Sequence, residues 1–222
     1  MKNLASYIDH TLLAVDATPE EIEKLCQEAL AYNFCSVCVN SSFVSQASKL
    51  LENSNVKVCS VVGFPLGAME TQAKAYEAKR AISNGASEID MVIAVGQLKS
   101  GNDSVVYEDI KALVGVCDGV ILKVIIETAL LNREEIIRVC ALVKDVGADF
   151  VKTSTGFSSA GAIIEDVRLM KQTVGDDMLV KASGGIRDTK CAIAMIEAGA
   201  SRLGVSAGVA IVEGFNAGEG AY

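Results

Sequence analysis

The sequence contains a single histidine, His10, and this scarcity limits the metal chemistry that it can support. Cys35 and Cys38 form a C-x-x-C pair, but three-residue spacing on a strand puts their side chains on opposite faces. With one histidine in the chain, no second pair of zinc ligands follows. We therefore predict no metal site, and as a separate expectation we assign no other cofactor. The seven cysteines are an odd number, which fits reduced thiols in a core better than a disulfide framework.

The sequence also lacks long apolar runs and an excess of positive charge. No run approaches the roughly 18 to 20 apolar residues that span a membrane, and the N-terminal segment MKNLASYIDH has no apolar signal core. Twenty basic and 28 acidic residues give a net charge of -8, which argues against binding to nucleic acid or to a membrane surface. We expect a cytoplasmic protein that binds neither.

The chain does contain a regular alternation of short apolar runs and helical patterns. With 222 residues, 50% of them hydrophobic, it can bury the core of one large domain. Helical patterns fill the gaps between runs of strand length. Eight such runs are Ser6–Asp9, Phe34–Val39, Val56–Val62, Glu88–Ala94, Val120–Ile126, Asp149–Thr153, Met178–Ala182 and Ser201–Val205.

Local signals mark the ends of several helices. Thr18 before Pro19, with Glu21 three residues after the threonine, predicts a helix start with a capping box. Asn132 and Glu135 open a second helix in the same way. Glycine accepts the left-handed conformation in which many helices end. Three helices are predicted to stop at such a glycine: Gly85, Gly147 and Gly199.

Strict alternation of strands and helices predicts parallel strands joined by right-handed crossovers. Eight units in a chain of this length fit a single (β/α)8 TIM barrel, which we assign to residues 1–212. A doubly wound open sheet is the alternative, but no G-x-G-x-x-G follows the first strand and no Walker lysine motif is present. Residues 213–222 are Gly-rich and are predicted to form a flexible C-terminal tail.

Charged residues inside apolar strands are the strongest functional signal. Lys152 lies in DFVKTSTGF and Lys181 in LVKASGGIR, while Asp90 and Lys123 lie on the fourth and fifth predicted strands. A buried ammonium is costly unless it is paired or neutralised. A structural ion-pair network would explain one such lysine. It explains three lysines facing one aspartate less well, because an excess of positive charge would remain even with Glu88 and Glu127 nearby.

That excess points to nucleophilic chemistry. A lysine beside another cation loses its proton more easily, and the neutral amine attacks a carbonyl to give a Schiff base. Asp90 could then move protons. Glycine-bearing loops follow the sixth, seventh and eighth strands, where barrels often bind phosphate through backbone N–H groups. A glycine in one such loop is explained equally well by a simple turn of the chain; the three loops together favour a phosphate site.

The sequence allows two interpretations for each of two further residues. Cys38 shares a strand face with Ser36 and either looks into the barrel or is a buried structural thiol. His10 lies beside Asp9, where it either helps to bind a substrate hydroxyl or packs with a satisfied hydrogen bond.

Seven segments, in order along nearly the whole chain, resemble the deoxyribose-phosphate aldolase family. They are YIDHTLL (7–13), VVGFPLG (61–67), EIDMVI (88–93), LKVIIET (122–128), FVKTSTGF (150–157), VKASGGIR (180–187) and RLGVSAG (202–208). The resemblance implies a metal-free class I aldolase of deoxyribonucleotide catabolism. Such an enzyme cleaves 2-deoxy-D-ribose 5-phosphate to D-glyceraldehyde 3-phosphate and acetaldehyde.

The same resemblance implies roles for individual residues. Lys152 matches the Schiff-base lysine, Lys181 the neighbour that eases its deprotonation, and Asp90 the proton-transfer carboxylate. The remaining positions match the substrate pocket (Asp9, Cys38, Lys123, Thr155) and the phosphate site (Gly156, Gly184, Gly185, Gly204, Ser206). Phe157 and Ala207 depart from some members, which carry a lysine and a second serine there; both changes remove phosphate contacts.

Tyr222, the last residue, is either disordered or a candidate proton relay to the Schiff-base carbon. The expected partners are a phosphorylated deoxy-sugar, aldehydes, and a second copy of the chain in a homodimer. Three alternatives stay open: a Schiff-base aldolase for another sugar phosphate, a sugar-phosphate isomerase, and a non-catalytic barrel that binds a sugar phosphate.

Overall fold

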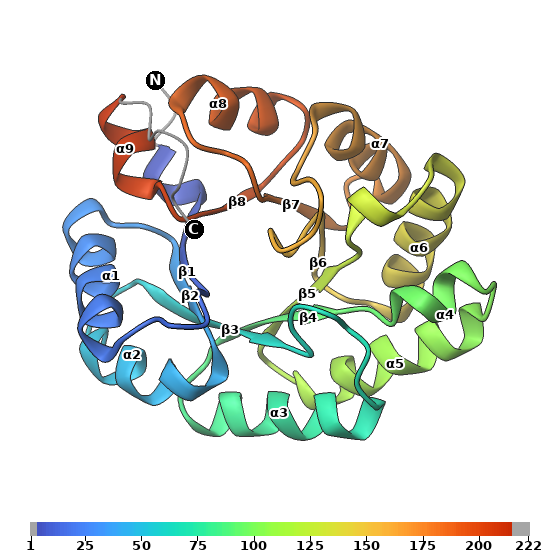
Figure 1. The fold of residues 1–222 in the computed structure, drawn as a ribbon, viewed down its shortest axis with the longest axis horizontal. Helices are drawn as coiled ribbons and strands as arrows, with labels where there is room; N and C mark the ends of the chain where they lie inside the picture. Colours follow the sequence, from blue (N-terminus) through green and yellow to red (C-terminus); the bar gives the residue numbers. More distant parts are fainter. Residues whose placement is uncertain (1–3, 215–222) are drawn as a thin grey trace.

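The computed structural model describes residues 4–214, in which eight parallel strands close into a barrel surrounded by helices (Figure 1). Each strand pairs in parallel with the next along the chain, and the last pairs with the first. The fold is thus the predicted (β/α)8 TIM barrel. The strands are β1 (Ile8–Leu12), β2 (Ser36–Val39), β3 (Lys57–Val62), β4 (Glu88–Val92), β5 (Ile121–Ile125), β6 (Phe150–Lys152), β7 (Leu179–Ser183) and β8 (Arg202–Val205).

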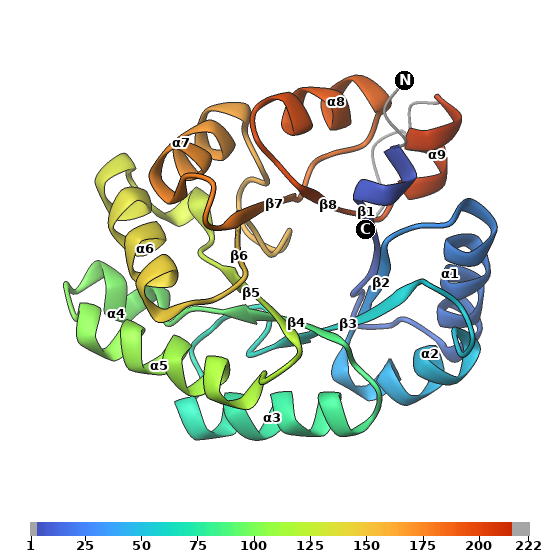
Figure 2. The same cartoon turned by 180° about the vertical axis from the view of Figure 1, so that it is seen from behind.

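The helices form a ring around this barrel, as the view from behind also shows (Figure 2). None of the helices among the described residues is long and apolar enough to cross a membrane. The α-helices are α1 (Pro19–Tyr32), α2 (Val44–Leu50), α3 (Thr71–Ser83), α4 (Val95–Lys99), α5 (Asp103–Val116), α6 (Arg133–Val146), α7 (Ile164–Val174), α8 (Thr189–Glu197) and α9 (Gly208–Glu213). Short 3-10 helices are η1 (Leu4–Tyr7), η2 (Ser41–Phe43) and η3 (Thr128–Leu130).

The predicted helix ends are present. The Thr18 side chain accepts a hydrogen bond from the backbone N–H of Glu21, whose carboxylate accepts one from the Thr18 N–H at 2.8 Å. Asn132 and Glu135 make the same capping box at the start of α6. Gly147 ends α6 with φ of 85°, in the left-handed region. These local signals therefore determine where α1 and α6 begin and where α6 ends before β6.

The first strand differs from its prediction. It was expected at Ser6–Asp9, but β1 runs from Ile8 to Leu12, and residues before it form η1. The sequence did not predict the extent of β1, because its polar residues Asp9, His10 and Thr11 interrupt the apolar run by which the other strands were identified. The His10 ring packs on Phe34 with ring centroids 5.0 Å apart, and its Nε2 lies 2.7 Å from a Glu28 carboxylate oxygen. Of the two interpretations of His10, these contacts support a packing residue with a satisfied hydrogen bond.

The main hydrophobic core lies between the strands and the helices. Outward-facing strand residues such as Val37, Ile89 and Leu203 join apolar helix residues in one buried cluster. A second, smaller cluster contains Cys38 and Cys59. Because side chains alternate along a strand, the positions between the outward residues face the barrel interior. The interior is where the charged strand residues converge.

Candidate active site

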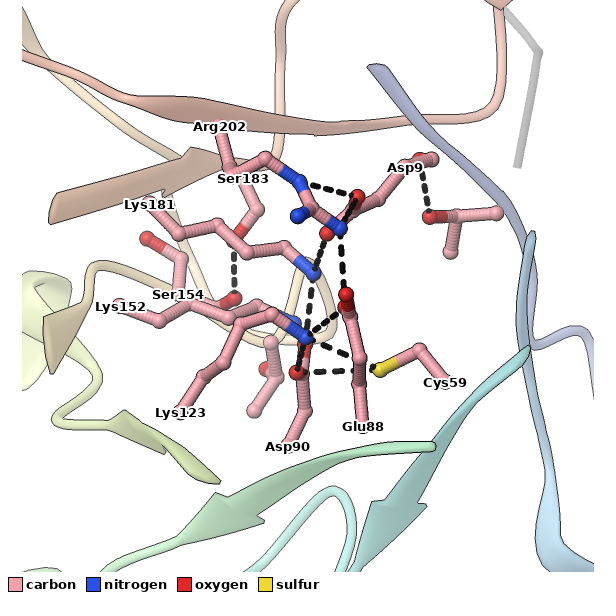
Figure 3. Close-up of polar contacts among 12 residues, drawn as sticks. Asp9, Cys59, Glu88, Asp90, Lys123, Lys152, Ser154, Lys181, Ser183 and Arg202 are labelled. Atoms are coloured by element: carbon pink, nitrogen blue, oxygen red, sulfur yellow. Dashed lines mark hydrogen bonds and ion pairs between the residues drawn. The ribbon is translucent and has the colours of Figure 1, made fainter. Parts of the chain in front are cut away.

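Asp90 of β4 holds three lysines together inside the barrel (Figure 3). The Nζ of Lys123 lies 2.8 Å from Oδ1, and the Nζ atoms of Lys152 and Lys181 each lie 2.7 Å from Oδ2. Strand register explains the meeting: Asp90 is opposite Lys123 in the β4–β5 pair, and Lys152 is opposite Lys181 in the β6–β7 pair. The predicted neighbouring arc of inward charges is therefore what these strands form.

Two further carboxylates enter the same network, so the expectation of one aspartate facing three lysines was incomplete. Asp9 lies 2.6 Å from the Lys181 Nζ, and Glu88 lies 2.6 Å from the Lys123 Nζ. Arg202 joins the two carboxylates, with its Nε donating to Asp9 at 2.7 Å and a terminal nitrogen to Glu88 at 2.8 Å.

Among the described residues, the connected network holds one more cation than carboxylates. The sequence analysis did not assign Arg202, although a basic residue two positions before Gly204 on a predicted strand shares that inward face. The predicted excess of positive charge remains, but it amounts to one unit. Its members are Lys123, Lys152, Lys181 and Arg202 against Asp9, Glu88 and Asp90.

Burial and ion pairing act in opposite directions on these groups. Burial favours the neutral form of Asp90, yet the surrounding lysines outweigh it and hold the pKa of that carboxyl well below its usual range. Burial likewise disfavours the ammonium of Lys181, but Asp9 and Asp90 raise its pKa. The pKa of Lys123 is raised in the same way, chiefly by Asp90 against the effect of burial. At neutral pH these three groups are fixed charges.

Lys152 differs from the other two lysines in its access. Lys123 and Lys181 are 0% exposed, whereas Lys152 is 3% exposed and ends β6, next to the loop that begins at Thr153. Because the Lys152 and Lys181 nitrogens both lie 2.7 Å from one oxygen, they are no farther apart than twice that distance. A carbonyl carbon attacked by Lys152 would therefore meet an adjacent cation and an adjacent carboxylate.

A buried glutamate fixes the loop after β6. Glu127 accepts a bond from the Thr155 backbone N–H at 3.3 Å, and the Thr155 hydroxyl donates to the same carboxylate. Burial raises the pKa of Glu127, while the bonds from Thr155 and the charge of Lys152 oppose that shift. Its backbone has φ of 57°, which is uncommon for a residue with a side chain. Thr155 is thus at the site, with its hydroxyl directed to Glu127.

The predicted phosphate residues come together at the barrel mouth. Four of them, Gly184, Gly185, Gly204 and Ser206, line one small cavity. Gly156 lies close by, because a Cβ added at Gly184 would be 3.5 Å from the Gly156 Cα. Gly184 has φ of 84°, and such an added Cβ would come 2.9 Å from the Gly161 Cα, so only glycine lets these two loops approach.

Arg187 lines the same cavity and was not assigned from the sequence. The only signal available was its place directly after the Gly184–Ile186 turn. Arginine at a glycine-lined cavity is well suited to an anion, because a guanidinium donates several hydrogen bonds in a fixed plane.

The two positions that depart from some family members lie at the rim. Phe157 is 47% exposed, and its ring meets Phe64 edge-on with centroids 5.3 Å apart. Ala207 is buried at the start of α9. Tyr222, the candidate proton relay, lies outside the described residues.

Cys38 lies inside the barrel beside a second thiol that the sequence analysis did not assign. Ligand atoms of Cys38, Cys59 and Asp90 lie within 4.8 Å of one another. However, the Lys123 Nζ lies 3.4 Å from the Cys59 Sγ and 2.8 Å from the Asp90 Oδ1. An ammonium therefore already occupies the position from which a metal cation would contact two of these three groups.

Comparisons with known proteins agree with this geometry. Residues 4–214 match the sequence model of a family described as DeoC/LacD family aldolase. A deoxyribose-phosphate aldolase from Carboxydothermus hydrogenoformans is 59% identical over 220 residues, covering 97% of this chain and 96% of that protein. One from a Geobacillus strain is 58% identical over 213 residues, covering 96% of each.

A solved structure gives the same relationship in three dimensions. The deoxyribose phosphate aldolase from Aeropyrum pernix, whose tetrameric structure is described as unique, superposes with a TM-score of 0.89 and 35% identity. The superposition covers 95% of this chain and 89% of that chain.

Proposed function

This chain belongs to the DeoC/LacD family of aldolases, and we propose that it cleaves 2-deoxy-D-ribose 5-phosphate to D-glyceraldehyde 3-phosphate and acetaldehyde. The observation that carries the proposal is the shared Asp90 oxygen that contacts both Lys152 and Lys181, next to a glycine-lined cavity whose Gly204 adjoins the Lys181 side chain. This lysine pair suits Schiff-base chemistry, and the cavity suits the phosphate of the substrate. The proposal assigns no metal or other cofactor to the reaction.

In the proposed reaction, the neutral amine of Lys152 attacks the aldehyde carbon of the open-chain sugar, and loss of water leaves a protonated Schiff base. A base removes the proton of the C3 hydroxyl, the C2–C3 bond breaks, and its electrons move into the Schiff base to form an enamine. Glyceraldehyde 3-phosphate leaves. Protonation of the enamine carbon and hydrolysis then release acetaldehyde and free Lys152.

Neighbouring charges supply the remaining roles in this proposal. Lys181, Lys123 and Arg202 keep positive charge next to Lys152, which favours the neutral amine over a further ammonium. Asp90 lies 2.7 Å from the Lys152 nitrogen, close enough to take up or return a proton directly or through water. Asp9, Cys38 and Thr155 are proposed to shape the pocket, and Gly156, Gly184, Gly185, Gly204 and Ser206 to hold the phosphate.

Borohydride trapping tests the covalent step. Reduction in the presence of acetaldehyde should add a two-carbon unit to Lys152, located by mass spectrometry of the digested protein. Lys123 and Lys181 are internal controls, since both lie in the same network. A label on either would overturn the assignment, and no label at all would favour an isomerase or a binding protein. Release of glyceraldehyde 3-phosphate, measured by a coupled assay, separates this aldolase from one for another sugar phosphate.

For the tail, we propose that residues 213–222 extend beyond a catalytic barrel of residues 1–212 and that Tyr222 relays a proton to or from the Schiff-base carbon. A phenol with a pKa near 10 is a weak acid suited to this late step. Deleting Tyr222 should leave borohydride trapping intact and slow turnover by about 10²-fold, the lower range for one general acid–base group. Turnover at the full rate would remove Tyr222 from the mechanism.

For assembly and location, we propose a homodimer in the cytoplasm. The related Aeropyrum pernix structure is a tetramer, which supports self-association without fixing the number of subunits. The seven cysteines are described as free thiols, as expected in a reducing compartment. Light scattering of the purified protein measures the assembly, and cell fractionation tests the location.

A further inference from the structure

Cys38 and Cys59 lie on neighbouring strands inside the barrel. They are register partners in the parallel β2–β3 pair, and both are 0% exposed. Adjacent strands lie about 4.7–4.9 Å apart, inside the Cα separation of about 4.4–6.8 Å that a disulfide allows. Their sulfurs lie, together with a carboxylate oxygen of Asp90, within 4.8 Å of one another. Closing the bridge thus needs side-chain rotation and little movement of the strands.

The two thiols differ in their surroundings. The Cys59 Sγ lies 3.1 Å from the Asp90 Oδ1, to which its hydrogen is donated. Burial, Cys38 and Asp90 all raise the pKa of the Cys59 thiol. The pKa of Cys38 is lowered by the Cys59 thiol as a hydrogen-bond neighbour and by the charges of Lys181 and Lys152, which together outweigh the opposing effects of burial and Asp90. Cys38 is therefore the thiol that ionises first, with Cys59 as its protonated neighbour.

We propose that Cys38 and Cys59 form a reversible disulfide that switches off the site when the protein meets a peroxide. The Cys38 thiolate attacks one oxygen of hydrogen peroxide, which gives a sulfenic acid and, after protonation, one water molecule. The Cys59 sulfur then attacks the Cys38 sulfur, the S–O bond breaks, and a second water leaves. Two thiols are oxidised and one peroxide is reduced. A dithiol reverses the change by exchange.

The site explains both how a peroxide would reach the thiols and how the disulfide would affect activity. Hydrogen peroxide is smaller than acetaldehyde, so an opening that admits the aldehyde to Lys152 admits the peroxide to the same interior. In the disulfide, Cys59 has no hydrogen to donate to Asp90, and Asp90 is the group that contacts Lys152. The inhibition rests on the proposed function, whereas formation of the bridge does not.

The proposal also predicts which of the cysteines do not react. Cys35 and Cys191 are partly exposed, so attack governed by exposure alone would fall on them first. The proposal predicts the opposite, because neither has a thiol as its register partner in the described strands. Cys35→Ser and Cys191→Ser are therefore matched controls that should leave both the disulfide and the activity unchanged.

The test exposes the reduced, full-length protein to limiting hydrogen peroxide, blocks free thiols with iodoacetamide and digests it without reductant. We expect a peptide pair joined through Cys38 and Cys59, lighter by two hydrogens, and loss of at least about ten-fold in activity, equivalent to about 1.4 kcal/mol. Dithiothreitol should restore the activity. Cys59→Ala should instead carry a Cys38 sulfenic acid that dimedone traps.

Alkylation of both Cys38 and Cys59 after peroxide, or a disulfide that uses Cys35 or Cys191, would overturn the proposal. A bridge that forms without loss of activity would overturn the switch. If the protein proves to have no aldolase activity, the mass measurement still decides whether the bridge forms. If Cys59→Ala fails to fold, the wild-type peptide map is sufficient.

Discussion

At the residue scale, Lys181 is a fixed cation beside Lys152, the amine that we propose as the nucleophile. It is fully buried, contacts Asp9 and Asp90, and keeps its proton because these carboxylates raise its pKa despite burial. In Lys181→Leu one positive charge is lost while both carboxylates stay. We expect the pH at which the borohydride-trapped adduct forms to rise by roughly two units, the effect of one charge about 5 Å away.

The pH profile of adduct formation measures this shift directly. Lys144→Leu provides the same substitution at a surface lysine whose partner is the exposed Asp177, and its profile should match the wild type. A Lys181→Leu profile that coincides with the wild-type one would mean that Lys181 acts through shape and not through charge.

Arg187 gives a second prediction at this scale. It lines the cavity formed by Gly184, Gly185 and Gly204 at the mouth and is not part of the buried ion-pair network. In Arg187→Ala the cavity loses its guanidinium, so KM for the phosphorylated sugar should rise about ten-fold or more, for a charge-assisted bond of roughly 1.5–3 kcal/mol. Steady-state kinetics should show kcat and the KM for unphosphorylated 2-deoxyribose little changed. Equal losses on both substrates would place Arg187 outside the phosphate site.

Which residues the sequence could predict depended on how far away their partners lie. Asp90, Lys123, Lys152 and Lys181 stood out because a charge on an apolar strand is conspicuous, and strand parity then gave their direction. Cys59 did not stand out, since a cysteine in an apolar strand is ordinary core. Its importance comes from Cys38 and Asp90, 21 and 31 positions away, and only the pairing of β2, β3 and β4 brings these groups together.

At the scale of elements, a buried ion pair connects α3 and α5 in the helical layer around the barrel. Lys74 is fully buried, its Nζ lies 2.6 Å from Asp109, and it also donates to the backbone oxygen of Val92 at 3.0 Å. Val92 ends β4, the strand that carries Asp90. The pair therefore joins two helices to the end of the strand that carries Asp90, a connection that the helical pattern around Lys74 does not reveal.

Lys74→Met should destabilise the protein by about 3–5 kcal/mol, because it leaves the Asp109 carboxylate buried without its cation. Urea unfolding measures the loss. Replacing both partners, in Lys74→Met with Asp109→Leu, should recover much of it, since an apolar pair of similar volume avoids the buried charge. If the double variant were no more stable than the single one, the loss would come from packing or from the Val92 bond.

Element boundaries were predictable where the signal is local. The capping boxes at Thr18 and Asn132 involve residues three apart, so sequence alone places the starts of α1 and α6. The predicted start of β1 was wrong, because the extent of this strand depends on its pairing with β2 and β8, which lie later in the chain. The count of eight units, in contrast, predicted closure, since parallel strands of this number satisfy one another's edges.

At the scale of the whole molecule, charge is distributed unevenly. The chain carries a net charge of -8, whereas the described network inside the barrel has one excess cation. An anionic sugar phosphate therefore gains no long-range attraction from the average surface charge. In the proposed function, recognition therefore comes from the mouth, where Arg187 and the glycine-bearing loops line one cavity. The negative net charge thus predicted the absence of nucleic-acid partners without excluding a local anion site.

The interior network also links the stability of the whole barrel to pH. Burial alone would raise the pKa of Asp9 and Asp90, but the adjacent cations lower both below the ordinary value of 3.8. Above that value the two carboxyls are ionised whether the chain is folded or unfolded, so their ion pairs contribute fully. As the pH falls below it, the unfolded chain binds protons first, and the contribution is lost. For Lys123 and Lys181, whose pKa values are raised, the contribution is full below 10.5 and is lost above it.

We therefore expect the network to contribute evenly to the free energy of unfolding between about pH 5 and 9 and to lose its contribution below about pH 4. Asp9→Asn should flatten the acid decline by up to about 1.4 kcal/mol per pH unit, because one fewer proton binds on unfolding. Urea titrations at pH 2 to 7 measure both slopes. Asp145→Asn, at an exposed residue of α6, is the control and should follow the wild-type curve. Parallel acid slopes for Asp9→Asn and the wild type would show that the Asp9 carboxyl does not couple folding to protons.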